Sequence, residues 1–189
     1  MARSRPAVGL VVGCVLAALV GLTLVGATLN FVLTSNDPVA VTAGAPLTTP
    51  ATVSGLSQVH TPELDRLARN GVAGMSGDGL TDALAAFYGT DGVPTLFVAA
   101  ARTGKGTDED AELDAIFDSV GETVGRPTAQ TFDGLSYRCQ QVRLPDVSPL
   151  IWVCGWSSKR STGMLMHYQA QAVAEAATAA DEARQSLEG

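Results

Sequence analysis

The sequence is poor in the residues that bind polyanions. Lysine occurs only at Lys105 and Lys159, so ten of the 12 basic residues are arginines, and the formal net charge is −7. A nucleic-acid-binding domain shows a basic face, and this balance therefore argues against nucleic acid as a partner. It fits an acidic domain that anionic lipid repels. Few lysines beside abundant alanine and glycine are typical of proteins encoded by GC-rich bacterial genomes.

Histidine is equally rare, and no nucleophile motif accompanies it. His60 lies close in sequence to Glu63 and Asp65, and His167 is the second histidine. A fold that brought them together would make an acid–base or metal cluster. No serine lies in a G-x-S-x-G sequence. We therefore expect no catalytic residue, no metal and no cofactor. An envelope hydrolase that uses His60 or His167 is the alternative.

Two other stretches resemble ligand-binding loops and fall short of them. Thr103–Thr107 reads TGKGT, but a phosphate-binding loop needs a glycine where Ala99 stands and Ser or Thr where Gly106 stands. Acidic residues alternate from Asp108 to Asp114, as they do early in a calcium loop, but the required later glycine and glutamate are missing. We interpret these stretches as a strand-to-helix turn and the acidic first turn of an exposed helix.

One long apolar run dominates the N-terminal end. Ala7–Leu33 contains no charged residue, and a helix needs about 20 apolar residues to cross a bilayer. Arg3 and Arg5 precede the run, and the first basic residue after it is Arg66. The run therefore predicts a single-pass anchor, with the N-terminus in the cytoplasm and the rest of the chain outside.

Two alternatives to an uncleaved anchor remain open. A cleaved signal peptide has a shorter apolar run of about 7–15 residues and an A-x-A-like site, and no clean site of that kind follows this run. A lipoprotein signal ending at Cys14 would leave only a short apolar stretch before the cysteine. All three interpretations place the remainder of the chain outside the cytoplasm. As part of an anchor, Cys14 is expected to be unpaired and inert.

A stripe of small residues lies within the apolar run. Gly9, Gly13, Ala17 and Gly21 recur at four-residue intervals, and on a helix they share one side. Such stripes let two transmembrane helices approach closely, so a homodimer or a partner-helix contact is one interpretation. The other is that glycine and alanine are simply common in membrane helices.

The remaining cysteines, Cys139 and Cys154, flank four turn residues from Pro145 to Ser148. Residues 137–144 and 149–156 suit strands, so we expect a hairpin that sets Cys139 opposite Cys154. Opposite residues have Cβ atoms about 4.5–5.5 Å apart, and an extracytoplasmic location favours a disulfide. The alternatives have less support, because zinc usually takes four ligands and the C-x-x-C of a redox pair is absent.

Between the apolar run and the C-terminus, helical and strand patterns alternate. The expected order is strand 54–60, helix 61–71, helix 78–89, strand 94–101, helix 107–121, a Pro/Gly-containing linker, the cysteine hairpin, strand 163–168 and helix 169–188. The hairpins require antiparallel pairing, so the predicted fold class is α+β, with helices over one face of the sheet. The last helix has little apolar surface beyond Val173 and alanines, so it packs lightly or extends as a polar tail.

These patterns divide the chain into five parts. They are a cytoplasmic tail (1–6), a transmembrane helix (7–33), a Pro/Thr/Ala-rich tether (34–53), an extracytoplasmic α+β domain (54–168) and a C-terminal helix or tail (169–189).

The C-terminal part resembles a known group of proteins. Gly134 precedes the first cysteine strand, and Cys139, Cys154–Ser157 and Thr162–Gly163 follow it. With the N-terminal anchor, this pattern resembles actinobacterial single-pass membrane proteins or lipoproteins of unassigned activity, which carry C-x-W near the end of a small outer domain. The resemblance implies membrane placement and a disulfide, and it implies nothing catalytic.

The sequence thus predicts a membrane-tethered binding or interaction module outside the cytoplasm. Its partner would be an envelope protein or a cell-wall ligand. The alternatives are the envelope hydrolase and a structural protein that dimerises through its transmembrane helix.

Overall fold

The computed structural model describes residues 46–75, 80–104, 108–144 and 150–189. The predicted anchor and most of the predicted tether lie outside this range. In the part of the chain that is described, no helix is both long and apolar enough to cross a membrane.

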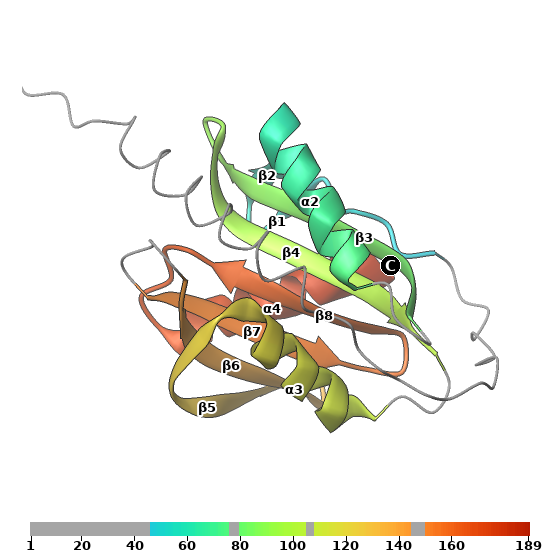
Figure 1. Ribbon diagram of the computed structural model, residues 1–189, viewed down its shortest axis with the longest axis vertical. Coiled ribbons are helices and arrows are strands. Elements are labelled where there is room, and N and C mark those ends of the chain that lie inside the picture. The colour runs from blue at the N-terminus through green and yellow to red at the C-terminus, as the bar shows by residue number, and fades with distance from the viewer. Residues whose placement is uncertain (1–45, 76–79, 105–107, 145–149) are drawn as a thin grey trace, which may run out of the picture.

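Eight strands form one antiparallel sheet, in the order β1-β2-β3-β4-β8-β7-β6-β5 (Figure 1). The strands are β1 (Thr52–Val53), β2 (Leu56–Gln58), β3 (Leu80–Thr90), β4 (Val93–Thr103), β5 (Glu122–Phe132), β6 (Leu135–Arg143), β7 (Ile151–Ser157) and β8 (Ser161–His167). The sheet therefore begins at Thr52, within the stretch predicted to be a tether.

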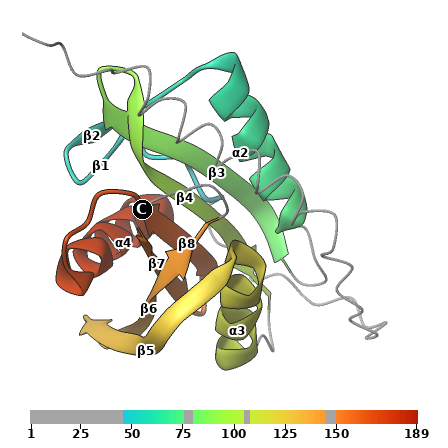
Figure 2. The same cartoon turned by 60° about the vertical axis from the view of Figure 1, so that its left-hand side comes forward.

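Helices cover both faces of the sheet. The described residues form α2 (Pro62–Gly74), α3 (Glu109–Val120) and α4 (Val173–Glu188). Helix α2 packs on β3 and β4, and α3 packs on β7 and β8, on one face; α4 crosses β6, β7 and β8 on the other (Figures 1 and 2). The predicted α+β class with a C-terminal helix is confirmed, but the expectation that helices cover only one face is wrong.

Helix α2 begins as the sequence predicts. The Thr61 hydroxyl accepts a hydrogen bond from the Leu64 amide (3.1 Å), and Pro62 occupies the first turn, where its missing N–H costs nothing. The predicted stop at Gly71 is wrong, since the helix continues to Gly74. Gly71 instead allows close packing, because a Cβ there would lie 3.2 Å from the Phe97 ring.

The second predicted helix, at residues 78–89, is wrong. Leu80–Thr90 form strand β3, which pairs with β4 through a turn at Asp91-Gly92. Phe87 packs on the α2 side of the sheet and Tyr88 on the α4 side. Because both faces are covered, the strand lacks the polar–apolar alternation of a half-exposed strand, and its apolar residues imitate a helical spacing.

Strand β5 occupies the segment predicted to be a linker. Its side chains are largely exposed, and it pairs only with β6, at the edge of the sheet. Its register shifts between Val124 and Thr128, around Gly125 and Pro127. A bulge and a proline are two of the ways in which proteins protect an edge strand from pairing with another chain. They also interrupt the strand pattern, so the strand is hard to recognise in the sequence.

The cysteine hairpin is confirmed. Cys139 of β6 lies directly opposite Cys154 of β7, and the two form a disulfide. Both cysteines are fully buried beside Tyr137 and Trp156, on the face that α4 covers. The bridge thus lies inside the core rather than at the surface.

Helix α4 packs far more closely than its composition indicated. Its inner side consists of alanines and Leu187 that are at most 2% exposed. Small side chains let the helix backbone lie close to the sheet, so an alanine face is as well buried here as a larger apolar face would be. The expectation of a lightly packed helix or a polar tail is therefore wrong.

Candidate functional site

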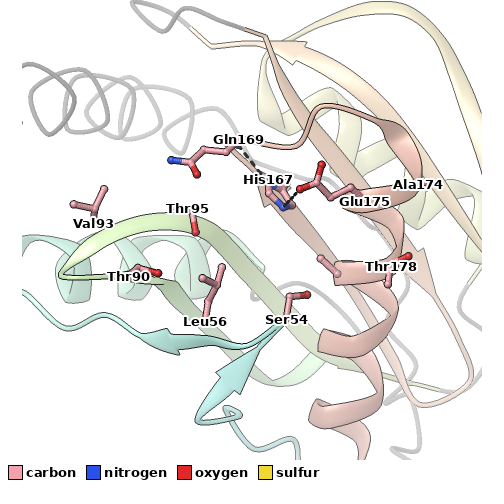
Figure 3. Close-up of a pocket in the computed structure, with 11 residues that line it drawn as sticks. Ser54, Leu56, Thr90, Val93, Thr95, His167, Gln169, Ala174, Glu175 and Thr178 are labelled. Atoms are coloured by element: carbon pink, nitrogen blue, oxygen red, sulfur yellow. Dashed lines mark hydrogen bonds and ion pairs between the residues drawn. The ribbon is translucent and has the colours of Figure 1, made fainter. Parts of the chain in front are cut away.

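A groove of about 760 Å³ opens where the N-terminal half of α4 faces the hairpin of β3 and β4. One wall comes from α4 and the end of β8, and the other comes from the β1–β2 turn and the β3–β4 hairpin (Figure 3). Its lining residues are mostly small, and they are Ser54, Leu56, Thr90, Val93, Thr95, His167, Gln169, Ala174, Glu175, Thr178 and Ala179.

Two tight turns bring the second wall into place. Ser54 and Gly55 join β1 to β2, and Asp91 and Gly92 join β3 to β4. All four have positive φ values, from 51° to 77°, which is the conformation that two-residue hairpin loops require. These turns carry Ser54 and the Thr90 side chain to the edge of the groove.

His167 and Glu175 form the polar centre of the groove. His167 ends β8 and is largely buried, and Glu175 lies in the first turn of α4 (Figure 3). The Nε2 atom of His167 lies 3.8 Å from Oε1 of Glu175. The Gln169 amide donates to Nδ1 of His167 (3.3 Å). The neutral ring therefore carries its proton on Nε2, which points toward the carboxylate.

The environment of His167 favours its neutral form. Burial lowers its pKa, and the nearby Glu175 carboxylate opposes this effect only in part. Glu175 also accepts a hydrogen bond from the Gln171 amide (2.9 Å) through its other oxygen, Oε2. This contact caps the start of α4, where Ala172 offers no side-chain cap. Glu175 is thus held in place while half of its side chain stays exposed.

The hydroxyl groups on the second wall are already oriented. Ser54 donates to Oε2 of Glu182 (2.7 Å), and Thr95 lies 3.5 Å from the Tyr88 carbonyl as a donor. Each hydroxyl oxygen keeps lone pairs that can accept a hydrogen bond from a ligand. Because Ser54 donates to Glu182 and not to His167, these residues do not form the serine–histidine pair of a serine hydrolase.

A second polar cluster, here called the α4 network, joins the C-terminal half of α4 to the sheet. The Tyr137 hydroxyl donates to Asp181 (2.6 Å) and accepts from Nε of Arg184 (2.6 Å). Arg184 also pairs with Asp181 (3.0 Å) and with Glu188 (2.8 Å). Burial, reinforced by the hydrogen bond to Asp181, raises the pKa of Tyr137.

The α4 network continues across the sheet to a buried tryptophan. Nε1 of Trp156 donates to the Ser161 hydroxyl (3.0 Å), which in turn donates to Glu188 (2.6 Å). Every polar side chain in this chain of contacts has a partner, as buried polar groups require. The α4 network is therefore a structural anchor for the helix, and the groove is the candidate site.

The two histidines have different contacts and lie in different surroundings. His60 precedes α2 and pairs with Asp65 at the surface (3.1 Å), and both side chains are well exposed. His167 instead lies in the groove with Glu175, and His60 is not among the lining residues. Across the described ranges, no three metal-ligating side chains are close enough to hold an ion.

The acidic first turn of α3 is an exposed helix face, as interpreted from the sequence. Asp108 caps the helix, accepting from the Asp110 amide (3.1 Å). Arg138 of β6 reaches this face and pairs with Asp110 and Asp114.

Other predicted positions also fall outside the described residues. They are Lys105–Thr107 of the TGKGT stretch, Cys14, and the small-residue stripe of Gly9, Gly13, Ala17 and Gly21. A contact between transmembrane helices through this stripe stays a prediction.

Comparison with protein-family models, curated proteins and solved structures finds no match. The candidate site therefore rests on its own geometry.

Sequence reasoning found His167 but missed its partners. Glu175 lies in a stretch that resembled a polar tail, Ser54 lies in the β1–β2 turn, and Thr95 lies on β4. The Asp91-Gly92 pair was the available indication, since Asp-Gly between apolar runs is a strong hairpin signature. It predicts the β3–β4 hairpin, but not which helix faces it.

Proposed function

We propose that this protein is a membrane-anchored binding module outside the cytoplasm, and that the groove is its binding site. The apolar run and the flanking arginines support the anchor and its orientation. The Cys139–Cys154 disulfide supports an oxidising compartment. The proposed partner is an envelope protein or a cell-wall ligand, in keeping with the resemblance to anchored outer-domain proteins.

The groove is the observation that carries the binding role. Its volume of about 760 Å³ lies within the range of about 300–1,000 Å³ that small-molecule sites occupy. Its polar groups are already hydrogen-bonded within the protein, and Ser54 links the second wall to Glu182 of α4, so the site is formed before a ligand arrives. A preformed site loses little conformational entropy on binding.

Photocross-linking in intact cells tests this role. A photoreactive amino acid is placed at Thr178 in the groove wall, and in a control chain at Ala111 on the exposed side of α3. Both positions are exposed on helices, so the two probes differ in the face that they sample. We expect adducts from position 178 alone. The same adducts from both positions, or none from either, would contradict a binding role for the groove.

Thiol trapping tests the placement. Cells are quenched in acid, unfolded and alkylated with one mass tag, then reduced and labelled with a second. We expect Cys139 and Cys154 to carry only the second tag. The first tag on both would show free thiols and would contradict the extracytoplasmic placement.

A further inference from the structure

The charge of the groove excludes one class of ligand. Glu175 is among its lining residues, Glu182 lies beside Ser54 at its edge, and the described lining residues include no lysine or arginine. An anionic ligand would meet negative charge with no cation to compensate for it. Phosphates, sulfates and acidic sugars therefore do not fit.

The central pair favours a particular functional group. Nε2 of His167 presents a hydrogen-bond donor, and Glu175 presents an acceptor, 3.8 Å away. This distance is too long for a direct hydrogen bond. A hydroxyl group is both donor and acceptor, so one hydroxyl can accept from the ring and donate to the carboxylate. An ammonium group has no lone pair and satisfies only the carboxylate.

The remaining lining residues suit the same chemistry. Ser54 and Thr95 use their protons on Glu182 and the Tyr88 carbonyl, and so offer acceptors to ligand hydroxyls. Leu56, Val93 and Ala174 add apolar surface beside these polar groups (Figure 3). A pyranose ring has the same combination, with hydroxyls at its rim and C–H groups on its faces.

We propose that the groove binds a neutral, hydroxyl-rich ligand of about di- or trisaccharide size, read by the His167–Glu175 pair. This inference rests on the proposed binding function and names its ligand class.

Three trisaccharides with matched size test the ligand class by NMR titration of the isotope-labelled full chain in a detergent without a sugar headgroup. Cellotriose is neutral, de-N-acetylated chitotriose has the same skeleton with ammonium groups in place of one hydroxyl per ring, and trigalacturonate is anionic. We expect cellotriose to bind weakly, with a Kd of about 1 mM, and to shift the amides of residues 167–179. The charged trisaccharides should bind more weakly.

Two variants test whether cellotriose binds in the groove, and two matched control variants show whether such substitutions disturb binding from elsewhere in the protein. Glu175→Gln removes the charged acceptor and should weaken cellotriose binding about tenfold or more. Ala174→Trp fills the groove from an exposed position and should abolish binding. The matched controls are Glu109→Gln and Ala111→Trp on α3, on the opposite face of the sheet, and both should bind like the wild type.

Each outcome separates this inference from the proposed function. Tighter binding of either charged trisaccharide in the groove would overturn the ligand class and leave the binding function intact. Cellotriose binding that Ala174→Trp does not affect would overturn the groove as the saccharide site. If no trisaccharide binds but the Thr178 probe forms adducts, the saccharide inference fails alone. If neither occurs, both proposals fail.

Discussion

The two faces of the sheet are held by different chemistry. On one face, Leu67 of α2 and Phe117 of α3 belong to an apolar cluster that includes Phe97 of β4. On the other face, α4 contributes mainly alanines, and the α4 network and the disulfide supply the specific contacts. Apolar packing is non-directional, whereas the hydrogen bonds and ion pairs of the α4 network are directional and fix the position of α4 on the sheet. The groove lies on the face where helix position is specified in this way.

The largest expected effect comes from breaking the α4 network. Arg184→Met leaves the buried Asp181 without its cation, and we expect the free energy of unfolding to fall by about 3–5 kcal/mol. Urea unfolding followed by tryptophan fluorescence measures the change. The control Arg66→Met removes an exposed pair on α2 and should change stability by less than about 0.5 kcal/mol.

A second substitution shows whether charge is the cause. Arg184→Met leaves both Asp181 and Glu188 without their cation, and adding Asp181→Asn removes one of these two unpaired charges, so the double variant should recover part of the lost stability. A double variant that is less stable than Arg184→Met would contradict an electrostatic origin.

The next largest effect comes from the covalent contact on the same face. Replacing Cys139 and Cys154 together by alanine opens a loop with a sequence separation of 15 residues. We expect a loss of about 3 kcal/mol, because the disulfide restricts the conformational entropy of the unfolded chain. Thermal unfolding with and without reductant measures this, since reductant should lower the midpoint of the wild type and leave the variant unchanged. A variant as stable as the oxidised wild type would contradict the prediction.

The N-terminal caps of α2 and α4 differ, and we expect substitutions at these caps to change stability by an intermediate amount. Thr61 caps α2, whereas Ala172 leaves α4 without a side-chain cap. Thr61→Ala should destabilise the protein by about 1 kcal/mol, and Ala172→Ser should stabilise it by a similar amount. Urea unfolding of both variants measures the two changes. Changes of the same sign would contradict this reading of the caps.

The smallest expected effect is a pH dependence of the protein's stability, which arises from His167 on the α4 face. The pKa of His167 is lowered in the folded state, so its stabilising contribution is complete above its unfolded value of about 6.5. As the pH falls below that value, the unfolded chain binds more protons and stability decreases. We expect His167→Gln to lose less stability on acidification than the wild type, measured as urea midpoints across this range. The Arg66→Met control should follow the wild type, and equal slopes for His167→Gln would contradict the prediction.

The elements that could be predicted are those specified by nearby residues. The cysteine hairpin follows from a four-residue turn between two strand patterns, and the start of α2 follows from Thr61 and Pro62. Strand β3 could not be told from a helix by its apolar spacing, because both of its faces are buried. The Asp91-Gly92 pair, given more weight, would have favoured the hairpin.

The groove could not be predicted in the same way. It joins a turn near residue 54, a hairpin near residue 92, the end of β8 and a helix beyond residue 172. No local pattern indicates that these segments meet. The close packing of α4 was hidden for a related reason, since alanine indicates helix formation but not which surface the helix contacts.

The burial of the disulfide has a consequence for the order of assembly. Cys139 and Cys154 are fully buried on the face that α4 covers, and α4 follows all eight strands along the chain. With α4 docked the two thiols are out of reach of an oxidant, so we expect them to react while α4 is still undocked. Closing the bridge aligns β6 and β7, which present Tyr137 and Trp156 to the arriving helix. We therefore expect the disulfide to form before the last helix docks and covers it.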